Sequence, residues 1–278
     1  MTTMTGKRVI ITGPTSGVGE AIALELGAQG AELVLACRDI AKGALLAAAI
    51  TRAGAAVAPA LMQIDLSSQA SIRAFARAYQ ARYDRLDVLI NNAAGNRGTL
   101  PKIAGPDGIE LTFATNVLGY FLLTNELLPL LKKSAPSRIV NVASTFASDL
   151  DLDDLQFERR PFESFKAYAQ SKACNRLLTW ALARRLEGSG VTANAMTPGL
   201  ITETGLYRNS GPELVERLSQ RSGGRTSAQG ADTAVWLASA PELEGVTDKF
   251  FDERKERPCE FRNEPDEERL WAICEALV

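Results

Sequence analysis

Hydrophobic residues recur along the chain with two different periods, and the two kinds of segment alternate. Short continuous runs of apolar and β-branched residues predict buried strands. Between these runs, apolar residues recur every three or four positions, which predicts helices; Val18, Ile22 and Leu26 form the first such set. The predicted strands cover residues 8–13, 31–37, 57–64, 86–91, 137–144 and 190–198.

Local signals mark two of the later elements. Ser67 or Ser68 is suited to cap the helix after the third strand, because a serine hydroxyl can accept a hydrogen bond from the first helical turn. That helix presents one apolar face, formed by Ile72, Phe75 and Tyr79. Residues 248–278 offer one further strand, a charged loop and a final helix.

Apolar strands separated by helices predict an α/β fold with a parallel sheet that helices cover on both faces. No linker rich in Pro, Gly and Ser divides the chain, so we expect residues 1–278 to form a single domain. Residues 202–225 break the pattern with scattered Gly, Pro and polar residues. We expect a substrate flap there, with a plain surface connection as the alternative.

Composition and charge exclude several classes of protein. Of the 278 residues, 46% are hydrophobic and 23% are charged, which is ordinary for a soluble globular protein. The formal net charge is −2 and no basic run occurs, so the patterns typical of nucleic-acid binding and of anionic-membrane binding are missing. The apolar runs are too short for a signal peptide or a membrane span, and we expect no membrane anchor.

Cysteine and histidine usage narrows the chemistry further. The cysteines have no paired spacing, which favours free thiols in a reducing cytoplasm over disulfides or a metal site: Cys37, Cys174, Cys259 and Cys274. The chain contains no histidine, so a Ser-His-Asp triad, a His-ligated zinc and an imidazole base are excluded. We expect no metal, and any proton transfer must come from Tyr, Lys, Cys or a carboxylate.

A glycine-rich segment, TGPTSGVG, follows the first strand and opens the first helix. Glycine permits a tight turn and a close approach of the backbone to a ligand. The helix N-terminus then offers unpaired N–H groups and the positive end of its dipole to a pyrophosphate. The segment predicts nucleotide binding, with a plain turn as the alternative, through Gly13, Thr15, Ser16, Gly17, Val18 and Gly19.

A phenol and an amine, Tyr168 and Lys172, lie one helical turn apart in the segment YAQSK. An unperturbed tyrosine has a pKa of about 10 and is a poor base at neutral pH. A lysine four residues later lies on the same helical face, and its charge would stabilise the phenolate and lower that pKa. The pair would form a general acid and base without histidine; an exposed pair without function is the alternative.

The motifs TGPTSGVG, NNAA, NVAS and YAQSK resemble, in order and approximate spacing, those of the short-chain dehydrogenase/reductase family. The resemblance covers essentially the whole chain. Longer strings, such as VLACRD and FLLTNELLPLLKKSAPSRIVNVAS, are similar to the retinol-dehydrogenase type within that family. The resemblance implies a single Rossmann-type doubly wound sheet and hydride transfer between a nicotinamide cofactor and a carbonyl/alcohol pair.

The resemblance also implies catalytic roles. Tyr168 would exchange a proton with the substrate oxygen, and Lys172 would support it and bind the nicotinamide ribose. Ser144 would polarise the substrate carbonyl, and Asn116 would hold a water that continues the proton path. Each residue alone has a plain structural alternative, such as a helix cap or a partner for a buried backbone group.

Cofactor contacts follow in the same way. Asp65 would bind the adenine amino group beside the Leu66 backbone, and the NNAA motif would line the adenosine side through Asn91, Asn92 and Ala93. Ala94 stands where the family usually has glycine, and we expect a small local adjustment there. The nicotinamide end would meet Pro198, Gly199, Ile201 and Thr202. Glu203 stands where the family often has threonine, so the threonine that contacts the cofactor stays open.

The end of the second strand indicates which nicotinamide cofactor is preferred. An acidic side chain there would accept hydrogen bonds from a ribose 2′-hydroxyl, but Cys37 holds that place and Arg38 follows. A guanidinium pairs well with a 2′-phosphate, and Lys42 can add a second cation. The sequence therefore predicts NADP(H) in preference to NAD(H). Asp39 weighs against this, and a solvated Arg38 is the alternative.

The substrate is expected to be a small lipophilic ketone, aldehyde or alcohol, because four phenylalanines lie near the catalytic segments: Phe146, Phe157, Phe162 and Phe165. Ordinary core packing of these residues is the alternative. Two other functions stay open, namely an NADP(H)-binding sensor or scaffold without turnover, and an epimerase or dehydratase. A homo-oligomer and a monomer both stay open as well.

Overall fold

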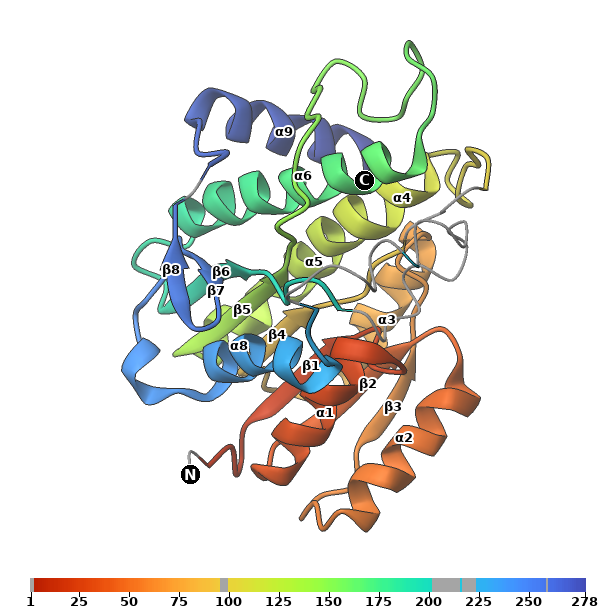
Figure 1. Ribbon diagram of the computed structural model, residues 1–278. Helices are drawn as coiled ribbons and strands as arrows, with labels where there is room; N and C mark the ends of the chain where they lie inside the picture. Colours follow the sequence, from red (N-terminus) through yellow and green to blue (C-terminus); the bar gives the residue numbers. More distant parts are fainter. Residues whose placement is uncertain (1–2, 96–99, 202–215, 217–223, 259) are drawn as a thin grey trace.

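The computed structural model describes residues 3–95, 100–201, 216, 224–258 and 260–278. Its centre is an eight-stranded sheet in the order β3-β2-β1-β4-β5-β6-β7-β8 (Figure 1). Neighbouring strands from β3 to β7 are parallel. The predicted α/β fold is therefore confirmed. The strands are β1 (Arg8–Thr12), β2 (Glu32–Cys37), β3 (Ala60–Gln63), β4 (Val88–Asn91), β5 (Ser137–Val142), β6 (Val191–Met196), β7 (Phe250–Asp252) and β8 (Lys255–Arg257).

Helices cover both faces of the sheet (Figure 1). One face carries α1 (Gly17–Ala28), α2 (Ile40–Arg52) and α8 (Ser227–Ser239). The other face carries α3 (Gln69–Arg82), α5 (Gly119–Lys133) and α6 (Ser164–Arg185), with α9 (Glu264–Leu277) packed on α6. Shorter elements complete the order: α4 (Leu111–Phe113), the π-helical turn η1 (Ala114–Leu118) and the 3₁₀ turn η3 (Pro241–Leu243).

Each face of the sheet has its own hydrophobic core. Strand residues alternate between the two: Ile10 and Leu89 pack with α3, α5 and α6, whereas Val9 and Ile90 pack with α1 and α8. Both cores form because the central strands carry apolar side chains on each face, as a doubly covered parallel sheet requires. The buried Ile72, Phe75 and Tyr79 belong to the first core, as predicted.

Side chains cap the N-termini of two helices, α3 as predicted and α2 in addition. Ser68, and not Ser67, caps α3: its hydroxyl accepts a hydrogen bond from the backbone N–H of Ser71. Asp39 caps α2 by accepting from the backbone N–H of Lys42 at 3.0 Å. Both caps satisfy N–H groups that have no partner within the helix.

The C-terminal segment differs from the expectation of one strand. It forms a hairpin, in which β8 pairs antiparallel with β7 and becomes the edge of the sheet. All three residues of β8, Lys255, Glu256 and Arg257, are exposed. A short charged edge strand exposes few unpaired backbone groups and discourages pairing with another sheet. Its charged sequence lacks the apolar pattern that predicts a buried strand.

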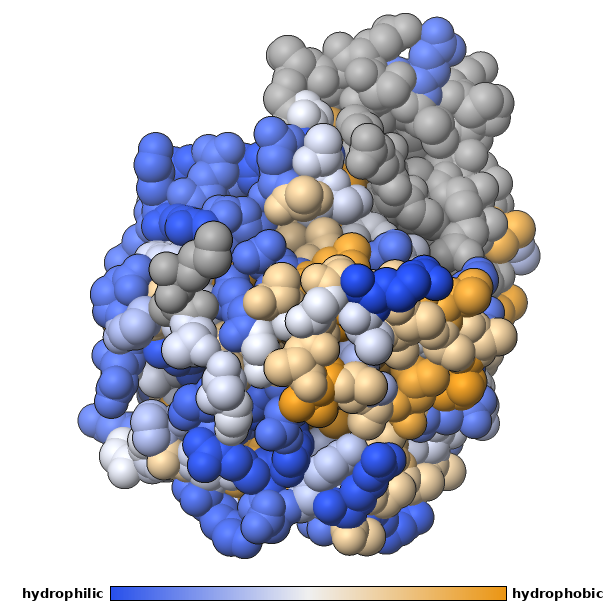
Figure 2. Space-filling view, turned by 90° about the horizontal axis from the view of Figure 1, so that it is seen from below, coloured by the Kyte–Doolittle hydropathy of each residue, from blue (hydrophilic) through white to orange (hydrophobic). Residues whose placement is uncertain are grey.

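Part of α2 leaves hydrophobic side chains exposed. Figure 2, which views the molecule from below, shows hydrophobic surface gathered from the centre to the right-hand side of that view. Leu45 is 72% exposed, Ile40 begins the helix exposed, and Val57 follows it exposed. Only Gly43, Leu46 and Ile50 of α2 are buried, so the alanine-rich helix uses one narrow face against the sheet.

Three further expectations concern metals, thiols and membranes. Within the described ranges, no group of His, Cys, Asp and Glu is arranged to hold a metal ion. Cys37, Cys174 and Cys274 are free and buried, and Cys259 lies outside the described residues. Among the helices of those same ranges, none combines the length and the apolar character that crossing a bilayer requires. The predicted flap lies outside the described residues, except for residue 216 and residues 224–225.

Candidate active site

The predicted site residues gather at the carboxyl ends of the central strands. The strand order reverses its direction between β1 and β4, and ligands of open α/β sheets bind at such a switch point. The hydroxyl of Thr12, which ends β1, accepts hydrogen bonds from the backbone N–H groups of Asn92 (2.9 Å) and Ala93 (3.1 Å). The loops that follow β1 and β4 are thereby joined.

The glycine-rich loop is shaped by close approach. Gly13 and Gly17 have φ angles of 61° and 59°, which side chains of L-residues rarely permit. A Cβ atom on Gly13 would meet the Cα of Ala93 at 2.8 Å, and one on Gly19 would overlap both the Asn92 side chain and the Gly13 carbonyl. Space and backbone conformation therefore both require glycine here.

The start of α1 is open to an anionic group. Ser16 is the N-cap residue, but its side chain makes no capping hydrogen bond and it is exposed. Thr15 and Val18 are partly exposed beside it. The Asn92 amide holds the loop in place by donating to the carbonyls of Thr12 (2.9 Å) and Gly13 (3.1 Å). The arrangement fits a bound phosphate group, because the N–H groups of the first turn point outward from the helix end.

Asn91 lies elsewhere than the resemblance implies. It is fully buried, and its amide donates to the Thr124 hydroxyl (3.0 Å) and to the Asn141 side-chain oxygen (2.9 Å). Asn141 in turn donates to Thr179 at 2.9 Å. Asn91 therefore ties β4 to β5 and α5 and does not line the cleft. In the rest of the motif, Asn92 and Ala93 are partly exposed and Ala94 is exposed.

The end of β2 presents a cation and a neutral thiol. Arg38 is exposed, while Cys37 is buried and burial, aided by the charge of Asp39, raises the pKa of its thiol. Asp39 is occupied by capping α2, and its second oxygen lies 3.9 Å from the Lys42 amine. The acid that weighed against a 2′-phosphate caps its own helix and lies beside Lys42, and Arg38 next to it is exposed.

Asp65 and Leu66 follow β3 as expected. One carboxylate oxygen of Asp65 accepts from the backbone N–H (2.9 Å) and the hydroxyl (2.7 Å) of Ser67. Leu66 is buried. A Cβ atom added to Gly119 would lie only 2.7 Å from the Leu66 carbonyl oxygen, which is too close. The absence of a side chain at Gly119 allows α5 to pass close to this loop.

The loop after β6 is held by a buried hydroxyl and a cation. The Thr197 hydroxyl accepts from the backbone N–H groups of Thr145 and Gly199, both at 3.1 Å, which joins the ends of β5 and β6. Arg225 donates to the Pro198 carbonyl (3.2 Å) and to Asp252 of β7 (2.7 Å). Ile201 is buried and pairs with Arg225, while Thr202 lies outside the described residues.

Tyr168 and Lys172 lie together inside the molecule. Both are buried, at 6% and 1% exposure, so the alternative of an exposed pair is wrong. The Lys172 Nζ lies 5.7 Å from the centre of the Tyr168 ring and donates to the Val142 carbonyl at 2.7 Å. Burial lowers the pKa of Lys172 to about 7, because the charged amine loses its hydration.

Asn116 lies in the π-helical turn η1, a geometry that is common at functional sites. Its amide group forms two hydrogen bonds with the Gly95 backbone, at 2.8 Å and 3.0 Å, and donates to the Ser171 hydroxyl at 3.0 Å. That hydroxyl donates to the Tyr168 carbonyl at 2.7 Å. In the orientation that satisfies both of its polar atoms, the Asn175 amide donates to the Asn116 carbonyl at 2.8 Å. The side chain of Asn116 therefore joins the turn to α6.

Ser144 stands two residues beyond the Val142 carbonyl and is 6% exposed. Its hydroxyl accepts from the Phe146 N–H at 3.0 Å. Its carbonyl accepts from Arg176 at 2.6 Å, a buried residue that also pairs with Glu260 at 3.2 Å. Sequence reasoning missed Arg176, although it lies four residues after Lys172 and so shares its helical face. Together Lys172 and Arg176 fasten α6 to the end of β5.

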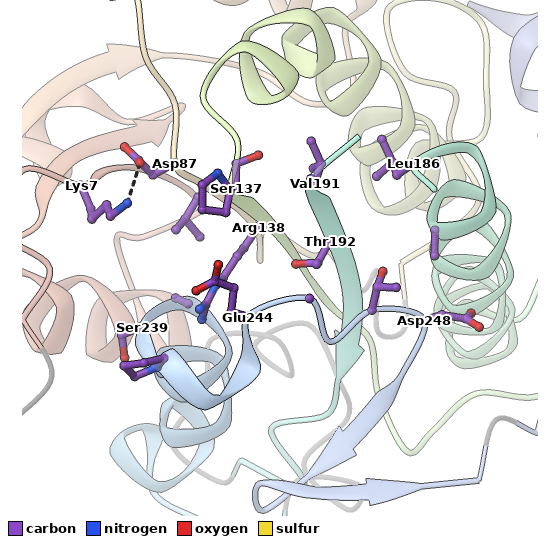
Figure 3. A pocket seen from close by; sticks show the side chains of 18 of the residues that line it. Lys7, Asp87, Ser137, Arg138, Leu186, Val191, Thr192, Ser239, Glu244 and Asp248 are labelled. Atoms are coloured by element: carbon purple, nitrogen blue, oxygen red, sulfur yellow. Dashed lines mark hydrogen bonds and ion pairs between the residues drawn. The ribbon is translucent and has the colours of Figure 1, made fainter. Parts of the chain in front are cut away.

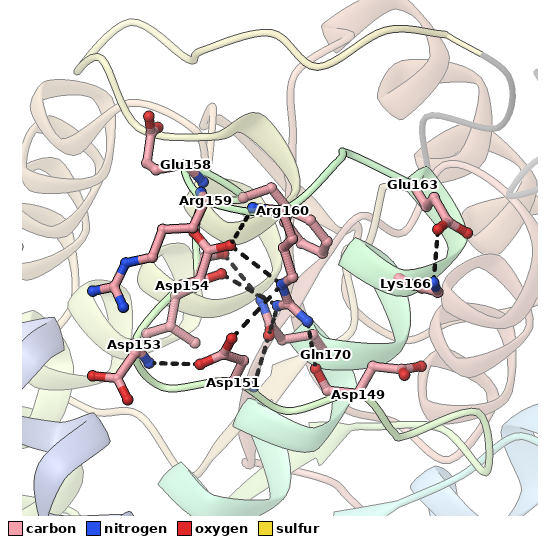
Figure 4. A network of polar contacts seen from close by, with 12 residues as sticks. Asp149, Asp151, Asp153, Asp154, Glu158, Arg159, Arg160, Glu163, Lys166 and Gln170 are labelled. Carbon is pink, nitrogen blue, oxygen red and sulfur yellow. Dashed lines mark hydrogen bonds and ion pairs between the residues drawn. The ribbon is translucent and has the colours of Figure 1, made fainter.

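The insertion between Ser144 and Tyr168 is held by a polar network (Figure 4). The Asp154 carboxylate accepts from three successive backbone N–H groups, those of residues 158, 159 and 160. Burial disfavours its charge, but these hydrogen bonds and Arg160 outweigh burial and lower the pKa of Asp154. Arg160 also donates to Gln170 at 2.6 Å, and Gln170 belongs to the YAQSK segment. The insertion is thus bound directly to the candidate catalytic helix.

The predicted phenylalanine cluster forms two separate pairs. Phe146 and Phe165 are in edge contact with ring centres 5.6 Å apart, and Phe165 lies 6.5 Å from the Tyr168 ring. Phe157 and Phe162 form the second pair at 5.5 Å. Phe165 is 41% exposed, whereas Phe157 is buried. Only the first pair therefore combines exposed aromatic surface with contact to the candidate catalytic residues.

A groove of about 710 Å³ lies at the opposite edge of the sheet, where β4, β5 and β6 begin (Figure 3). Lys7, Asp87 and Arg138 are among its lining residues. None of the predicted site residues lines it. Its size alone does not make it the active site, because the candidate chemical groups lie at the carboxyl edge.

Comparison with known proteins places this geometry in a family. The model of the family described as short chain dehydrogenase matches residues 7–214. Human retinol dehydrogenase 14 is 40% identical over 296 residues, which covers 99% of this chain and 87% of that protein. Mouse retinol dehydrogenase 12 is 41% identical over 279 residues, with 98% and 86% covered.

Solved structures agree. An uncharacterized protein from Mycobacterium paratuberculosis has a TM-score of 0.77 at 29% identity, covering all of this chain and 95% of that one. RhlG of Pseudomonas aeruginosa, solved as an NADP active-site complex, has a TM-score of 0.71 at 27% identity, with 90% and 95% covered. With a family match over more than half of its length, and relatives at about 40% identity over nearly all of it, the chain belongs to the short-chain dehydrogenase family and is an oxidoreductase.

Proposed function

We propose that the protein is an NADP(H)-dependent carbonyl reductase or alcohol dehydrogenase that acts on small lipophilic ketones, aldehydes or alcohols. The observation that carries the proposal is the buried Tyr168–Lys172 pair on the helix that also binds Asn116 and the end of β5. The retinol dehydrogenases named above support a lipophilic substrate.

In this mechanism Tyr168 exchanges the proton with the substrate oxygen. The positive charge of Lys172 stabilises the phenolate, and the Ser144 hydroxyl donates to the carbonyl oxygen on which negative charge develops. Asn116 holds η1 against α6 and keeps the turn in position beside Lys172. The nicotinamide cofactor supplies or accepts the hydride when it is bound.

NADP(H) is the proposed cofactor because the residues at the end of β2 suit a phosphate. Arg38 is exposed there, Cys37 is neutral, and Asp39 is engaged with α2. Gly13, Gly19 and the uncapped start of α1 would hold the pyrophosphate. RhlG, whose NADP complex is known, supports this choice at 27% identity.

The proposed substrate contacts are the rings of Phe146 and Phe165. They touch each other beside Tyr168, and the Phe146 backbone N–H is bound to the Ser144 hydroxyl. An exposed aromatic pair next to the reacting groups favours an apolar substrate, because burying such a surface under a ligand is favourable.

The test is reduction of a panel of lipophilic aldehydes and ketones, followed by loss of NADPH absorbance, for wild type, Tyr168→Phe and Tyr83→Phe. Tyr168→Phe removes only a hydroxyl, and we expect kcat to fall by roughly 10²- to 10⁴-fold, as is typical for loss of a general acid. Tyr83, the partly buried C-cap residue of α3, is not among the candidate site residues and serves as the control; its variant should keep wild-type rates. Equal rates for all three proteins would overturn the mechanism.

Cofactor preference is tested in the same assay with NADH and with Arg38→Ala. We expect Arg38→Ala to weaken NADPH use by roughly tenfold or more and to leave NADH use nearly unchanged, since only NADPH carries the 2′-phosphate. Arg52→Ala, at the far end of α2, is the control.

Tight NADPH binding without turnover of any substrate would favour a sensor or scaffold. A product formed without net cofactor oxidation would favour an epimerase or dehydratase.

A further inference from the structure

Tyr120 is buried beside the candidate catalytic residues and was not singled out by its sequence. It is the second residue of α5, directly after the π-helical turn that contains Asn116. It is 4% exposed, and its hydroxyl has no hydrogen-bond partner among the described residues. Desolvation, together with the nearby Tyr168, raises the pKa of Tyr120 well above its usual value. The residue therefore stays a neutral phenol.

The Lys172 amine lies over two aromatic rings. Its Nζ is 5.6 Å from the centre of the Tyr120 ring and 5.7 Å from that of Tyr168. A cation within about 6 Å of a ring centre is attracted to the negative face of the ring, and the attraction is greater where water is excluded. Lys172 is 1% exposed, so this condition is met.

Other groups near Lys172 leave its charge largely uncompensated. In the described part of the chain, Nζ has one hydrogen bond, to the Val142 carbonyl of β5, and no carboxylate contacts it. Asn141 of β5 and Asn116 of η1 carry no titratable group. On α6 itself, Tyr168 lies one turn before Lys172, and Arg176 lies one turn after it, bound to the Ser144 carbonyl and Glu260. Among the described residues, the contacts that stabilise the ammonium are thus the two rings and the Val142 carbonyl.

We propose that Tyr120 is a positioning residue of the reaction: its ring holds the Lys172 ammonium against Tyr168 and keeps it protonated. The ring acts through its π face, so its hydroxyl is dispensable. The inference rests on the proposed function only where it assigns Lys172 a part in catalysis; the interaction between Tyr120 and Lys172 is independent of turnover.

The electrostatic effect of the ring can be measured on the full-length protein without substrate. Lysine labelled with ¹³C at Cε reports protonation by NMR, and Lys172→Met identifies the signal of Lys172. We expect wild type to titrate with a midpoint near 7. Tyr120→Phe retains the ring, so its midpoint should stay within about 0.3 of the wild-type value, because the hydroxyl contributes little to the cation–π attraction.

Tyr120→Leu removes the ring, and we expect the midpoint to fall by about 0.4 to 1.5 units, the range that corresponds to a cation–π attraction. Water entering a space left by the substitution would shift the midpoint in the opposite direction, toward the ordinary lysine value. The sign of the shift therefore separates the two causes. A raised or unchanged midpoint in Tyr120→Leu overturns the inference.

Fluorinated phenylalanines in place of Tyr120 keep the volume and the fold while they withdraw electrons from the ring. One, two and three fluorines should lower the Lys172 midpoint in successive steps, because each weakens the negative face of the ring. Phe121, which packs on Trp271, is the matched control position, and fluorination there should leave the midpoint unchanged. A midpoint that does not depend on the number of fluorines at position 120 overturns the inference.

The same series then tests the role in the reaction. In the reductase assay, kcat is measured as a function of pH for each variant. The pH at which kcat falls on the alkaline side should decrease by the same amount as the NMR midpoint of Lys172, since the reaction needs the charged amine. A purely structural role for Tyr120 would change the rate without changing this pH. Failure of the proposed function would appear as an absence of turnover with the NMR series intact, whereas failure of this inference would appear in the NMR series itself.

Discussion

Gly13 and Gly19 are glycines for different physical reasons, although both belong to one loop. Gly13 has a backbone conformation in the left-handed region and also lies against Ala93. Gly19 is helical, and what excludes a side chain there is the presence of Asn92 and the Gly13 carbonyl. The loop is therefore packed against the end of β4, and this contact keeps the first turn of α1 open toward the candidate site.

Gly19→Ala should damage the loop through this contact. The added methyl group would separate the Asn92 amide from the Gly13 carbonyl, which are now 3.1 Å apart. We expect the free energy of unfolding to fall by about 1–3 kcal/mol, as is typical of overpacking. We also expect NADPH binding to weaken by at least roughly tenfold, or about 1.4 kcal/mol. Urea unfolding and NADPH fluorescence titration measure the two effects.

Gly95→Ala is the control for this substitution. Gly95 lies in the neighbouring loop, and a Cβ atom there would meet nothing within 4 Å. Its φ angle is not among the positive ones, so alanine fits its backbone conformation. Stability of Gly95→Ala should stay within about 0.5 kcal/mol of wild type, because a Cβ atom there meets no described atom and the backbone hydrogen bonds with Asn116 are kept. If the two variants lost the same stability, the contact at Gly19 would not be the cause.

At the scale of elements, the insertion of residues 149–163 is ordered by hydrogen bonds and not by secondary structure. Asp154 is its centre, because its carboxylate satisfies three backbone N–H groups that no helix or sheet would satisfy. Phe157 within it has a φ of 55°, which is unfavourable for a bulky residue and persists only where the surroundings hold it. Arg160, 4.4 Å above the Phe157 ring, binds this turn to Gln170 of α6.

Asp154→Asn keeps the size of the side chain but replaces one acceptor oxygen with a donor that faces backbone N–H groups. We expect a loss of about 2–4 kcal/mol of unfolding free energy, since a buried charged acceptor and its hydrogen bonds are broken. Denaturant unfolding measures the loss, and amide hydrogen exchange should show faster exchange at residues 158–160.

The neighbouring Asp153 offers a matched control. Its side chain is 57% exposed and pairs with Arg269 on the surface at 2.5 Å. An exposed ion pair contributes little, because water and salt screen it, so Asp153→Asn should leave the unfolding free energy nearly unchanged. Equal losses in the two variants would contradict the central role of Asp154.

At the scale of the whole molecule, the C-terminal helix α9 closes the outer surface of α6 and α5 (Figure 1). Trp271 packs edge-on against Phe121 of α5, with ring centres 4.8 Å apart. Glu267 is fully buried and pairs with Arg184 of α6, and it also accepts from the Asn263 backbone N–H at 3.1 Å. The C-terminal helix α9 therefore packs on the outer side of α6, the candidate catalytic helix.

Glu267→Gln should loosen this closure. A neutral amide in its place leaves Arg184 with weaker pairing and places a donor against a donor, and we expect a loss of about 2–4 kcal/mol. Thermal unfolding measures the loss, and limited proteolysis should release the C-terminal helix sooner. The exposed Glu264, in the first turn of the same helix, is the control, and Glu264→Gln should stay within about 0.5 kcal/mol. Release at the wild-type rate in Glu267→Gln would show that α9 does not depend on the buried pair.

Short stretches of the chain are enough to predict the alternation of strands and helices, the glycine-rich turn after β1 and the helical spacing of Tyr168 and Lys172. These features depend on periodicity and on residues close together in the chain, so local patterns suffice to predict them. The eighth strand was missed because its short, exposed and charged sequence pairs only with β7 and has no apolar period of its own.

Which side chains contact one another in the site depends on the packing of distant elements. Asn91, adjacent to Asn92 in the motif, faces the opposite way and is buried against Thr124 and Asn141. Lys172 meets the Tyr120 ring, and Arg176 meets the Ser144 carbonyl, across 52 and 32 positions of the chain. Such contacts depend on how helices from distant parts of the sequence pack over one sheet edge. The spacing of hydrophobic residues within a single segment does not predict that packing.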